Sequence, residues 1–462
     1  MFRSFFPVPK IFFWSALIWM LFATLVFQLV GDPIRNVISI DRFLTVNVCA
    51  PNEVPANPVT PPGEAAPPVP PVAETNPNAP ASTESAAPAA TSVVADCVVE
   101  DTSFLNGGRV WEYWFIFLCT VAFCAFWYFY KRNQWYWWSV VGSAGLLLAT
   151  YGQVQINAWQ NDWQGSFFNV VQRALSEPGS VSPTEYWPYV ATLFAVVIPN
   201  ILFLIAIAFF TSHYVFRWRK AMTSYYMEYW PALSSTEGAA QRVQEDTMRF
   251  ADIMESLGTA FFSSLLTLIV FLPILWRLSA NITELPVFGA LPGSLVWVCL
   301  VVAAFGTVLL WGVGIKLPGL NFENQKVEAA LRKELVYGED NADRADPPTF
   351  RQLFSNVQRN YFRLYFHYTY FNLARYAYLN VAGFIPLVAL SPSILAGTIT
   401  LGIYQQVQNA FGEVASSFQF FARAWTTIIE LQSIYMRLHK FESFIPHDQE
   451  PIKESVSGAA TI

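Results

Sequence analysis

The sequence predicts an all-α polytopic membrane protein with about eight transmembrane helices. Only 13% of its 462 residues are charged, whereas charged residues make up about a quarter of ordinary soluble proteins. Hydrophobic residues account for 54% and aromatic residues for 17%. The mean hydropathy of +0.35 is modest for a membrane protein, so polar segments must separate the apolar ones.

Apolar stretches long enough to cross a bilayer recur along the chain. A transmembrane helix needs about 20 mostly apolar residues, and eight stretches meet this need. They are 11–30, 111–130, 137–158, 190–212, 256–278, 294–315, 366–390 and 394–422. The first stretch follows Arg3 and Lys10, as a signal peptide would. Because its apolar run is long and no small-residue cleavage pattern ends it, we expect a retained anchor; the alternative is a cleaved signal peptide.

The distribution of Lys and Arg predicts the orientation of these helices. Basic residues gather in 131–136, 213–250 and 316–365, and they are scarce in 159–189 and 279–293. Cytoplasmic loops carry the excess of Lys and Arg in membrane proteins. An even number of spans with both termini in the cytoplasm fits all of these segments.

Spans and orientation together divide the chain into four parts. They are an N-terminal transmembrane helix (1–30), an outer, periplasmic proline-rich loop (31–108), a transmembrane core (109–440) and a cytoplasmic C-terminal tail (441–462). Within the core, the segments 213–255 and 316–365 are predicted to continue as long helices into the cytoplasm. Pro231 is expected to end the helix that continues from the stretch 190–212, and a turn is expected after it.

The outer loop consists largely of Pro, Ala, Val, Thr, Asn and Glu between Pro51 and Pro88. Such a composition buries too little apolar surface to fold and favours extended conformations, so we expect a disordered loop. Cys49 and Cys97 bracket the segment, and in an oxidising compartment they could form a disulfide at its base. The alternative is two free thiols.

Several kinds of chemistry have no motif in the sequence. There is no G-x-x-x-x-G-K-[ST] motif for nucleotide phosphates, so we do not expect this chain to bind a nucleotide or to be a self-contained ATP-driven pump. There is also no H-E-x-x-H, C-x-x-C or G-x-S-x-G motif, and the four histidines are scattered. We therefore expect no metal, no cofactor and no enzymatic activity. The formal net charge of −6 argues against a nucleic acid as partner.

Acidic residues gather on the helix that leads into the stretch 256–278. On an ideal α-helix, Glu245 and Asp252 lie about 20° apart, and Glu255 lies within about 80° of Glu245. A second acidic pair, Glu328 and Glu339, would share a face to within about 20° if its helix continued past Gly338. Carboxylates at the mouth of a membrane cavity can load and release protons, and their field attracts cations.

The alternative for these acidic residues is an ordinary solvated helix surface. Glu245 and Glu328 each have an arginine four residues later, which is the usual spacing of surface ion pairs. Glu255 differs because its helix is already entering the membrane, where an ionisable residue marks a functional site. Glu413 falls under the same rule. Its polar neighbours indicate a face that lines a wet cavity, and they are Gln405, Gln406, Gln408 and Asn409.

Six blocks of the sequence resemble one known family. They are M-F-R-S-F-F-P-V-P-K, S-H-Y-V-F-R-W-R-K-A-M, E-G-A-A-Q-R-V-Q-E-D-T-M-R-F-A, G-I-K-L-P-G-L-N-F-E-N-Q-K-V-E-A-A-L-R-K-E-L-V-Y-G-E-D, N-Y-F-R-L-Y-F-H-Y-T-Y-F-N and S-I-L-A-G-T-I-T-L-G. On these blocks the chain resembles the SbmA/BacA family of bacterial inner-membrane peptide transporters. The resemblance covers almost everything except the proline-rich loop.

The resemblance implies a membrane fold similar to that of ABC exporters without a nucleotide-binding domain. It also implies a homodimer in the bacterial inner membrane that imports antimicrobial and host-derived peptides, driven by the proton gradient. The family's ladder of cavity glutamates corresponds to Glu245, Glu255, Glu328 and Glu339. Asp252 and Glu413 have no counterpart in that ladder.

The sequence thus leads to a dimeric, proton-driven importer of cationic or proline-rich peptides that works by alternating access. Peptides, protons and membrane lipids are the expected partners. Two alternatives remain open. One is the membrane subunit of an ATP-driven transporter whose ATPase is a separate chain. The other is a membrane-embedded enzyme or scaffold that acts on envelope lipids, for which the sequence offers no nucleophile, metal or cofactor site.

Overall fold

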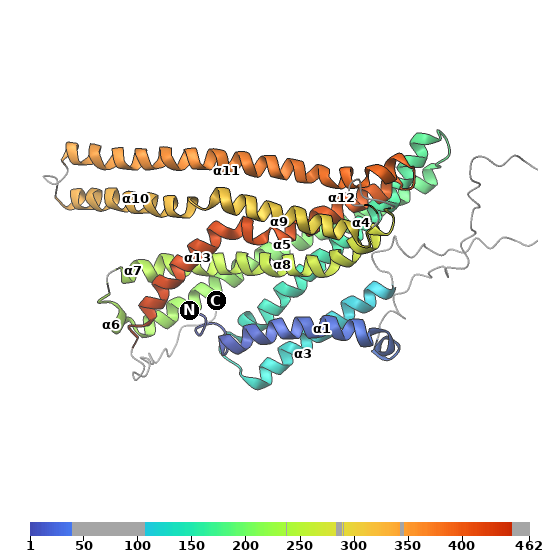
Figure 1. The fold of residues 1–462 in the computed structure, drawn as a ribbon. Helices are drawn as coiled ribbons and strands as arrows, with labels where there is room; N and C mark the ends of the chain where they lie inside the picture. Colours follow the sequence, from blue (N-terminus) through green and yellow to red (C-terminus); the bar gives the residue numbers. More distant parts are fainter. Residues whose placement is uncertain (39–106, 237, 283–288, 290, 342–345, 446–462) are drawn as a thin grey trace, which may run out of the picture.

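The computed structural model describes residues 1–38, 107–236, 238–282, 289, 291–341 and 346–445. These residues form helices, and there is no β-strand among them (Figure 1). The helices are α1 (Pro9–Ile38), α3 (Gly107–Tyr130), η1 (Trp137–Gly142), α4 (Ser143–Ser176), α5 (Pro183–Glu228), α6 (Trp230–Leu233), α7 (Ala239–Gln241), η2 (Arg242–Asp246), α8 (Thr247–Ser279), α9 (Ser294–Gly314), α10 (Leu317–Asp340), α11 (Pro347–Leu395), α12 (Leu401–Phe418) and α13 (Phe420–Glu442).

Five helical stretches in the described residues are long and apolar enough to cross a membrane. They are Arg109–Tyr130, Pro183–Glu228, Ala239–Ser279, Ser294–Glu339 and Pro347–Leu395. Each contains one of the predicted spans, so the protein is a multi-pass membrane protein. The predicted stretches 11–30, 137–158 and 394–422 coincide with helices that are not among these five. The total of eight transmembrane helices therefore stays a prediction.

The predicted span 394–422 is wrong as a single helix. Helix α11 continues to Leu395, and the chain turns at Gly397, whose φ of 67° is a conformation that glycine adopts without strain. Helix α12 begins after Thr400, whose hydroxyl accepts a hydrogen bond from the first turn of that helix and so caps it. A second break at Gln419 separates α12 from α13.

Two further boundaries differ from the prediction. Helix α1 reaches Ile38, so the outer loop does not begin at residue 31. Helix α5 ends at Glu228, before Pro231, which lies in the first turn of the short helix α6. Proline is tolerated at this position because its missing N–H would have no partner in the helix. Pro231 therefore starts a new helix instead of ending α5.

The helix that carries the second acidic pair meets the condition stated for it. Helix α10 continues through Gly338 to Asp340, so Glu328 and Glu339 belong to one uninterrupted helix. Their spacing of eleven residues then places both on the same side of α10.

The helix that carries the first acidic group is not an ideal α-helix. Before α8 begins, residues 242–246 form the π-helical turn η2. A π-helical turn is wider than an α-helical turn and contains an extra residue. The angle predicted between Glu245 and Asp252 therefore does not apply, because it assumes an unbroken α-helix.

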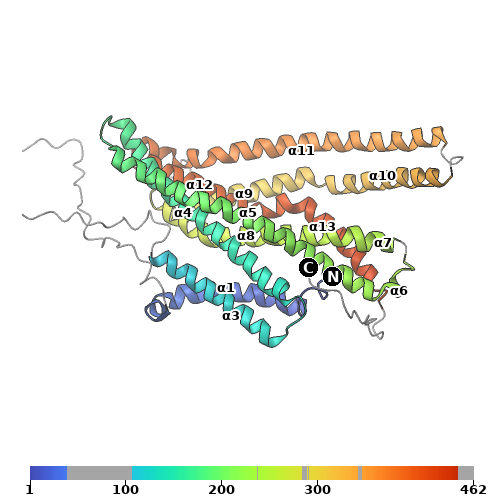
Figure 2. The same ribbon diagram turned by 180° about the vertical axis from the view of Figure 1, so that it is seen from behind.

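The helices form an elongated bundle with two distinct edges (Figures 1 and 2). Helices α10 and α11 pack against each other as a long antiparallel pair along one edge, while α1 and α3 lie along the opposite edge. Helix α12 contacts α4, α8 and α9, and α13 contacts α8. The amino group of Met1 pairs with Glu442 at the end of α13. Residue 1 and the end of α13 consequently lie at the same end of the bundle.

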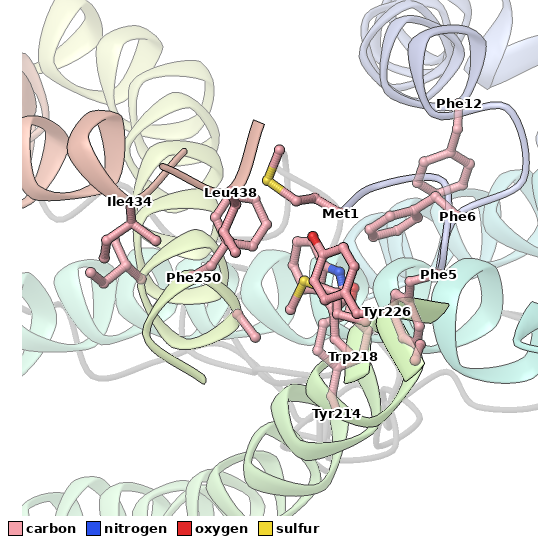
Figure 3. Close-up of a cluster of buried hydrophobic side chains, with 14 of the residues drawn as sticks. Met1, Phe5, Phe6, Phe12, Tyr214, Trp218, Tyr226, Phe250, Ile434 and Leu438 are labelled. Carbon is pink, nitrogen blue, oxygen red and sulfur yellow. The ribbon is translucent and has the colours of Figure 1, made fainter. Parts of the chain in front are cut away.

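The segment before α1 is buried among aromatic side chains of α5 and α8. Phe5 is stacked on Trp218 with ring centroids 5.7 Å apart, and Phe2 meets Phe250 edge to face at 5.4 Å. Figure 3 shows Met1, Phe5 and Phe6 beside residues of α5, with Leu438 of α13 close by. These contacts join α1, α5, α8 and α13 at one end of the bundle.

Helices α4 and α12 approach each other closely because glycines lie at their contact. A Cβ atom on Gly402 would come within 2.0 Å of the backbone oxygen of Gly165. Asn169 and Gln172 of α4 accept hydrogen bonds from the first backbone N–H groups of α12, at 3.0 and 2.7 Å. Small residues and interhelical hydrogen bonds are the usual means of packing helices in a membrane. This contact joins α12 to α4, a helix whose earlier residues line the cavity described next.

Candidate functional site

A cavity of about 330 Å³ lies inside the bundle, between α1, α3, α4, α5 and α8. Its walls are mainly apolar and aromatic, with two carboxyl groups among them, those of Glu112 and Glu255. Binding sites for small molecules are typically apolar cavities with a few placed polar groups. The aromatic residues of the wall include Phe6, Phe12, Trp19, Phe123, Trp218 and Phe262.

Glu255 reaches this cavity from α8, two turns after the helix begins. Its side chain is half-buried, and its Oε1 accepts a hydrogen bond of 2.9 Å from the hydroxyl of Thr259, one turn later. Asp252, three residues earlier, is exposed and is not part of the cavity wall. Of the six acidic residues singled out in the sequence, Glu255 is the one that lines this cavity.

Glu112 is a cavity residue that the sequence analysis missed. It lies near the start of α3, and its Oε1 accepts hydrogen bonds from the hydroxyl of Tyr151 and from Nε2 of Gln155, the latter at 3.0 Å. The Gln155 amide also donates to the Tyr151 hydroxyl at 2.7 Å. The signal was present, because Glu112 falls inside the predicted span 111–130, and the rule applied to Glu255 applies to it equally.

An ion pair between α3 and α4 lies next to Glu112 and its hydrogen-bond partners Tyr151 and Gln155. Arg109 of α3 donates to Asp162 of α4, with Nη2 and Oδ2 2.6 Å apart. Arg109 lies three residues before Glu112, and Asp162 lies seven residues after Gln155. The contact between α3 and α4 is therefore polar over several turns, within a bundle that is otherwise mostly apolar.

Glu245 lies outside the cavity in a network of surface charges. Its Oε1 is 3.0 Å from Nη2 of Arg249, and its Oε2 accepts a hydrogen bond of 3.1 Å from Gln241. Arg249 also reaches Glu430 of α13 at 3.5 Å. This arrangement is the one expected of a solvated helix surface, although it also connects α8 to α13.

Glu328 and Glu339 lie far from the cavity. Glu328 is half-buried and Glu339 is exposed, both on α10. Helix α10 packs mainly against α11, and it is well separated from α8 in Figures 1 and 2. Within a single chain, Glu328 and Glu339 therefore lie apart from Glu245 and Glu255.

Glu413 and the amides near it occupy helix contacts. Asn409 donates to Gln164 of α4, and Gln408 donates to the backbone oxygen of Gly383 in α11 at 2.8 Å. Glu413 itself is half-buried on α12. Asn409 and Gln408 thus hydrogen-bond to neighbouring helices, which is a usual role of amide side chains in membrane helices. The wet face that the sequence suggested stays a prediction.

The cysteines and histidines provide no metal site in the part of the chain that the structure describes. No group of three or more His, Cys, Asp or Glu side chains there is arranged to hold a metal ion. Cys119, Cys124 and Cys299 are free thiols. Cys49 and Cys97 lie outside the described residues, so their pairing stays a prediction.

Next to Glu245, the carboxylate of Asp246 is buried under α13. Arg437 of α13 donates to it from Nε at 3.0 Å and from Nη2 at 2.8 Å. These hydrogen bonds raise the pKa of the Arg437 guanidinium, and they outweigh the opposing effect of desolvation. This pair was not predicted, because the two residues are 191 positions apart in the sequence.

Comparison with known proteins identifies relatives among membrane transporters. The chain is 26% identical over 320 residues to the inner membrane ABC transporter ATP-binding protein YddA of Escherichia coli, covering 64% of this chain and 55% of that protein. It is 23% identical over 347 residues to the chloroplastic ABC transporter D family member 2 of Arabidopsis thaliana, covering 69% and 46%. The chain thus spans about half the length of these relatives.

The model of the SbmA/BacA-like family matches residues 132–446. This match includes α4, α5 and α8 to α13, and with them Glu255, Tyr151 and Gln155 of the cavity. Because the match extends over most of the chain, the protein belongs to the SbmA/BacA-like family of membrane transporters.

Proposed function

We propose that this protein imports peptides across the bacterial inner membrane, driven by the proton gradient, and that it works as a homodimer by alternating access. The observation that carries the proposal is the carboxylate of Glu255 in the wall of an apolar, aromatic cavity within the helix bundle. We assign no enzymatic activity to the chain, and we place both termini in the cytoplasm, in keeping with the basic segments and with the contact between Met1 and Glu442.

The chemistry of the cavity supports proton coupling. A carboxylate in apolar surroundings loses hydration and binds a proton more readily than it does in water. When ionised, the same group attracts a cationic peptide, and the field is focused by the low-dielectric walls. Protonation of Glu255 would weaken the hold on the peptide and accompany the change of access.

The α10–α11 pair supports a second copy of the chain as partner. Large apolar side chains repeat along one face of α11 at helical spacing. They are Phe354, Phe362, Tyr365, Phe366, Leu373 and Tyr376, and all are exposed. The first three lie in the segment 316–365 that we place in the cytoplasm, where lipid does not cover them. A partner copy would bury this face and could also bring Glu328 and Glu339 to a shared cavity.

The test of this proposal is uptake by proteoliposomes that contain only this chain, with an imposed pH gradient and no ATP. We expect a labelled proline-rich cationic peptide to accumulate only when the gradient is present. Accumulation that is absent with the gradient and appears when ATP and an ATPase are supplied would contradict the proposal.

A second candidate function is the membrane part of an ATP-driven transporter with a separate ATPase chain. The relatives favour it, because YddA is named as an ATP-binding protein of an ABC transporter and the present chain spans 55% of its length. Peptide uptake by whole cells that persists when an ionophore collapses the proton gradient, while ATP is maintained, would favour this alternative.

A further inference from the structure

We propose that Glu112 is a second proton-binding carboxylate of the transporter and that it serves the periplasmic end of the cavity, while Glu255 serves the cytoplasmic end. This inference rests on the proposed function, and it adds the residue that takes up the proton from outside. The contacts of Glu112, its position along the membrane and its place in the cavity each support it.

The contacts of Glu112 are suited to a group that changes its charge. Its two hydrogen bonds come from neutral donors, the hydroxyl of Tyr151 and the amide of Gln155, and both end on Oε1. No cation is paired with it among the ion pairs of the described residues, since Arg109 is engaged with Asp162. A proton can therefore bind at Oε2 without breaking an ion pair, and its release leaves a carboxylate that keeps both donors.

The position of Glu112 follows from the direction of its helix. Helix α3 runs from Gly107 to Tyr130 and is followed by Lys131 and Arg132, so its start lies on the outer side in the proposed orientation. Glu112 is five residues from that start, or about 8 Å at 1.5 Å per residue. Helix α8 runs in the opposite direction, and Glu255 lies near its inner end.

One continuous cavity joins the two carboxylates. Along α4, the cavity wall includes Ser143 and Tyr151, which are eight residues and about 12 Å apart. Ser143 lies at the inner end of this wall and shares a hydrogen bond of 2.7 Å with Tyr214 of α5. Tyr151 lies at the outer end with Glu112. Hydroxyl groups thus occur along the wall from one carboxylate toward the other.

The charged and titratable groups around Glu112 are few. They are Arg109 and Tyr113 on α3, and Tyr151 and Asp162 on α4. Helices α1 and α8 contribute apolar side chains to this end of the cavity, apart from Glu255 further in. Arg109 forms its ion pair with Asp162, and its charge also acts on Glu112 without a direct contact between them. Glu112 is the carboxyl group at this end of the cavity that has no ion-pair partner among the described residues, so its charge can change without breaking an ion pair.

The experiment compares two transport modes of the full-length protein in proteoliposomes. Accumulation driven by a pH gradient requires proton release, whereas exchange of labelled for unlabelled peptide at equal pH does not. We expect Glu112→Gln to lower accumulation at least tenfold and to retain exchange within about threefold of wild type. Glu177→Gln, an exposed glutamate at the outer end of α4, is the matched control and should retain both modes.

A structural role for Glu112 predicts a different pattern. Equal losses of accumulation and exchange in Glu112→Gln would overturn the inference, and so would retention of both. Tyr151→Phe provides a milder variant that keeps the ring and removes one donor, and it should shift the dependence of accumulation on external pH upward, because the carboxylate loses a hydrogen bond that favours its ionised form. An unchanged pH dependence in that variant would also contradict the inference. If wild-type protein fails to accumulate peptide, the proposed function itself fails.

Discussion

The guanidinium of Arg437 on α13 binds both oxygens of the buried Asp246 carboxylate at the end of η2, at 3.0 and 2.8 Å. The Asp246 side chain is 6% exposed, whereas that of Arg437 is 45% exposed. The pair thus holds the last described helix against the start of the helix that carries Glu255. It lies on the side of the bundle that we place in the cytoplasm.

Removing the arginine should destabilise the protein. Arg437→Ala leaves the Asp246 carboxylate buried without its partner, and we expect a loss of about 1–3 kcal/mol, less than for a fully buried pair because water screens the exposed arginine. Thermal unfolding in detergent measures the effect. Lys440→Ala, an exposed residue on the same helix, is the control. Equal melting temperatures for the two variants would show that the pair does not stabilise the fold.

The close contact between α4 and α12 makes a second prediction. Gly402→Ala places a methyl group against the backbone oxygen of Gly165, which cannot move aside as a flexible side chain could. Overpacking of this kind costs about 1–3 kcal/mol, so the melting temperature should fall. Gly412→Ala changes the same helix at a position with open space around the added Cβ, and it should melt like wild type. A fall of the same size in Gly412→Ala would mean that helix composition, and not the contact, is responsible.

The acidic residues should differ in their effects on transport. Glu245 is held by Arg249 and Gln241 at the surface, whereas Glu255 lines the cavity. We therefore expect Glu245→Gln to reduce initial uptake rates less than about threefold and Glu255→Gln to reduce them at least about tenfold, or 1.4 kcal/mol. Rates of the two purified variants in the same vesicles provide the comparison. If Glu245→Gln lowered the uptake rate more than Glu255→Gln, the coupling residue would be Glu245 in the surface network and not the cavity residue Glu255.

The exposed face of α11 predicts the oligomeric state. Native mass spectrometry of protein in nanodiscs should show twice the mass of the 52.1 kDa chain. Phe362→Arg puts a charge on the exposed face and should shift the protein toward the single chain, while Phe209→Arg, on an exposed face of α5, should leave the dimer intact. A single-chain mass for the wild type would remove the support for a shared cavity.

Much of the helical framework could be predicted from local sequence. Apolar runs of sufficient length predicted the five helices that can span a membrane. Whether the helix of Glu328 continues past Gly338 was left open, and α10 does continue to Asp340. The predicted spans 366–390 and 394–422 place the break between α11 and α12 a few residues before Gly397, where the structure has it. Hydropathy alone does not locate a helix end to within a few residues. The π-helical turn η2 was not predicted, because nothing in the pattern of residues 242–246 distinguishes it from an α-helical turn.

The candidate site was predicted in part. The depth of Glu255 within its helix was enough to single it out, since depth follows from position along a helix. Glu112 was overlooked because aromatic neighbours dominate the stretch 111–130, and its partner Tyr151 comes from another helix. The use of Asn409 in a contact with Gln164 likewise depends on how α4 and α12 pack, which no local pattern reveals.

The central claim is that a carboxylate in the cavity couples peptide import to the proton gradient. The most direct test is ATP-free uptake by proteoliposomes, comparing wild type, Glu255→Gln and Asp252→Asn with and without a pH gradient. Asp252 is exposed and three residues from Glu255, so it controls for a change of charge in the same segment. We predict gradient-dependent accumulation in wild type and Asp252→Asn and none in Glu255→Gln. Undiminished gradient-dependent accumulation in Glu255→Gln would contradict the account.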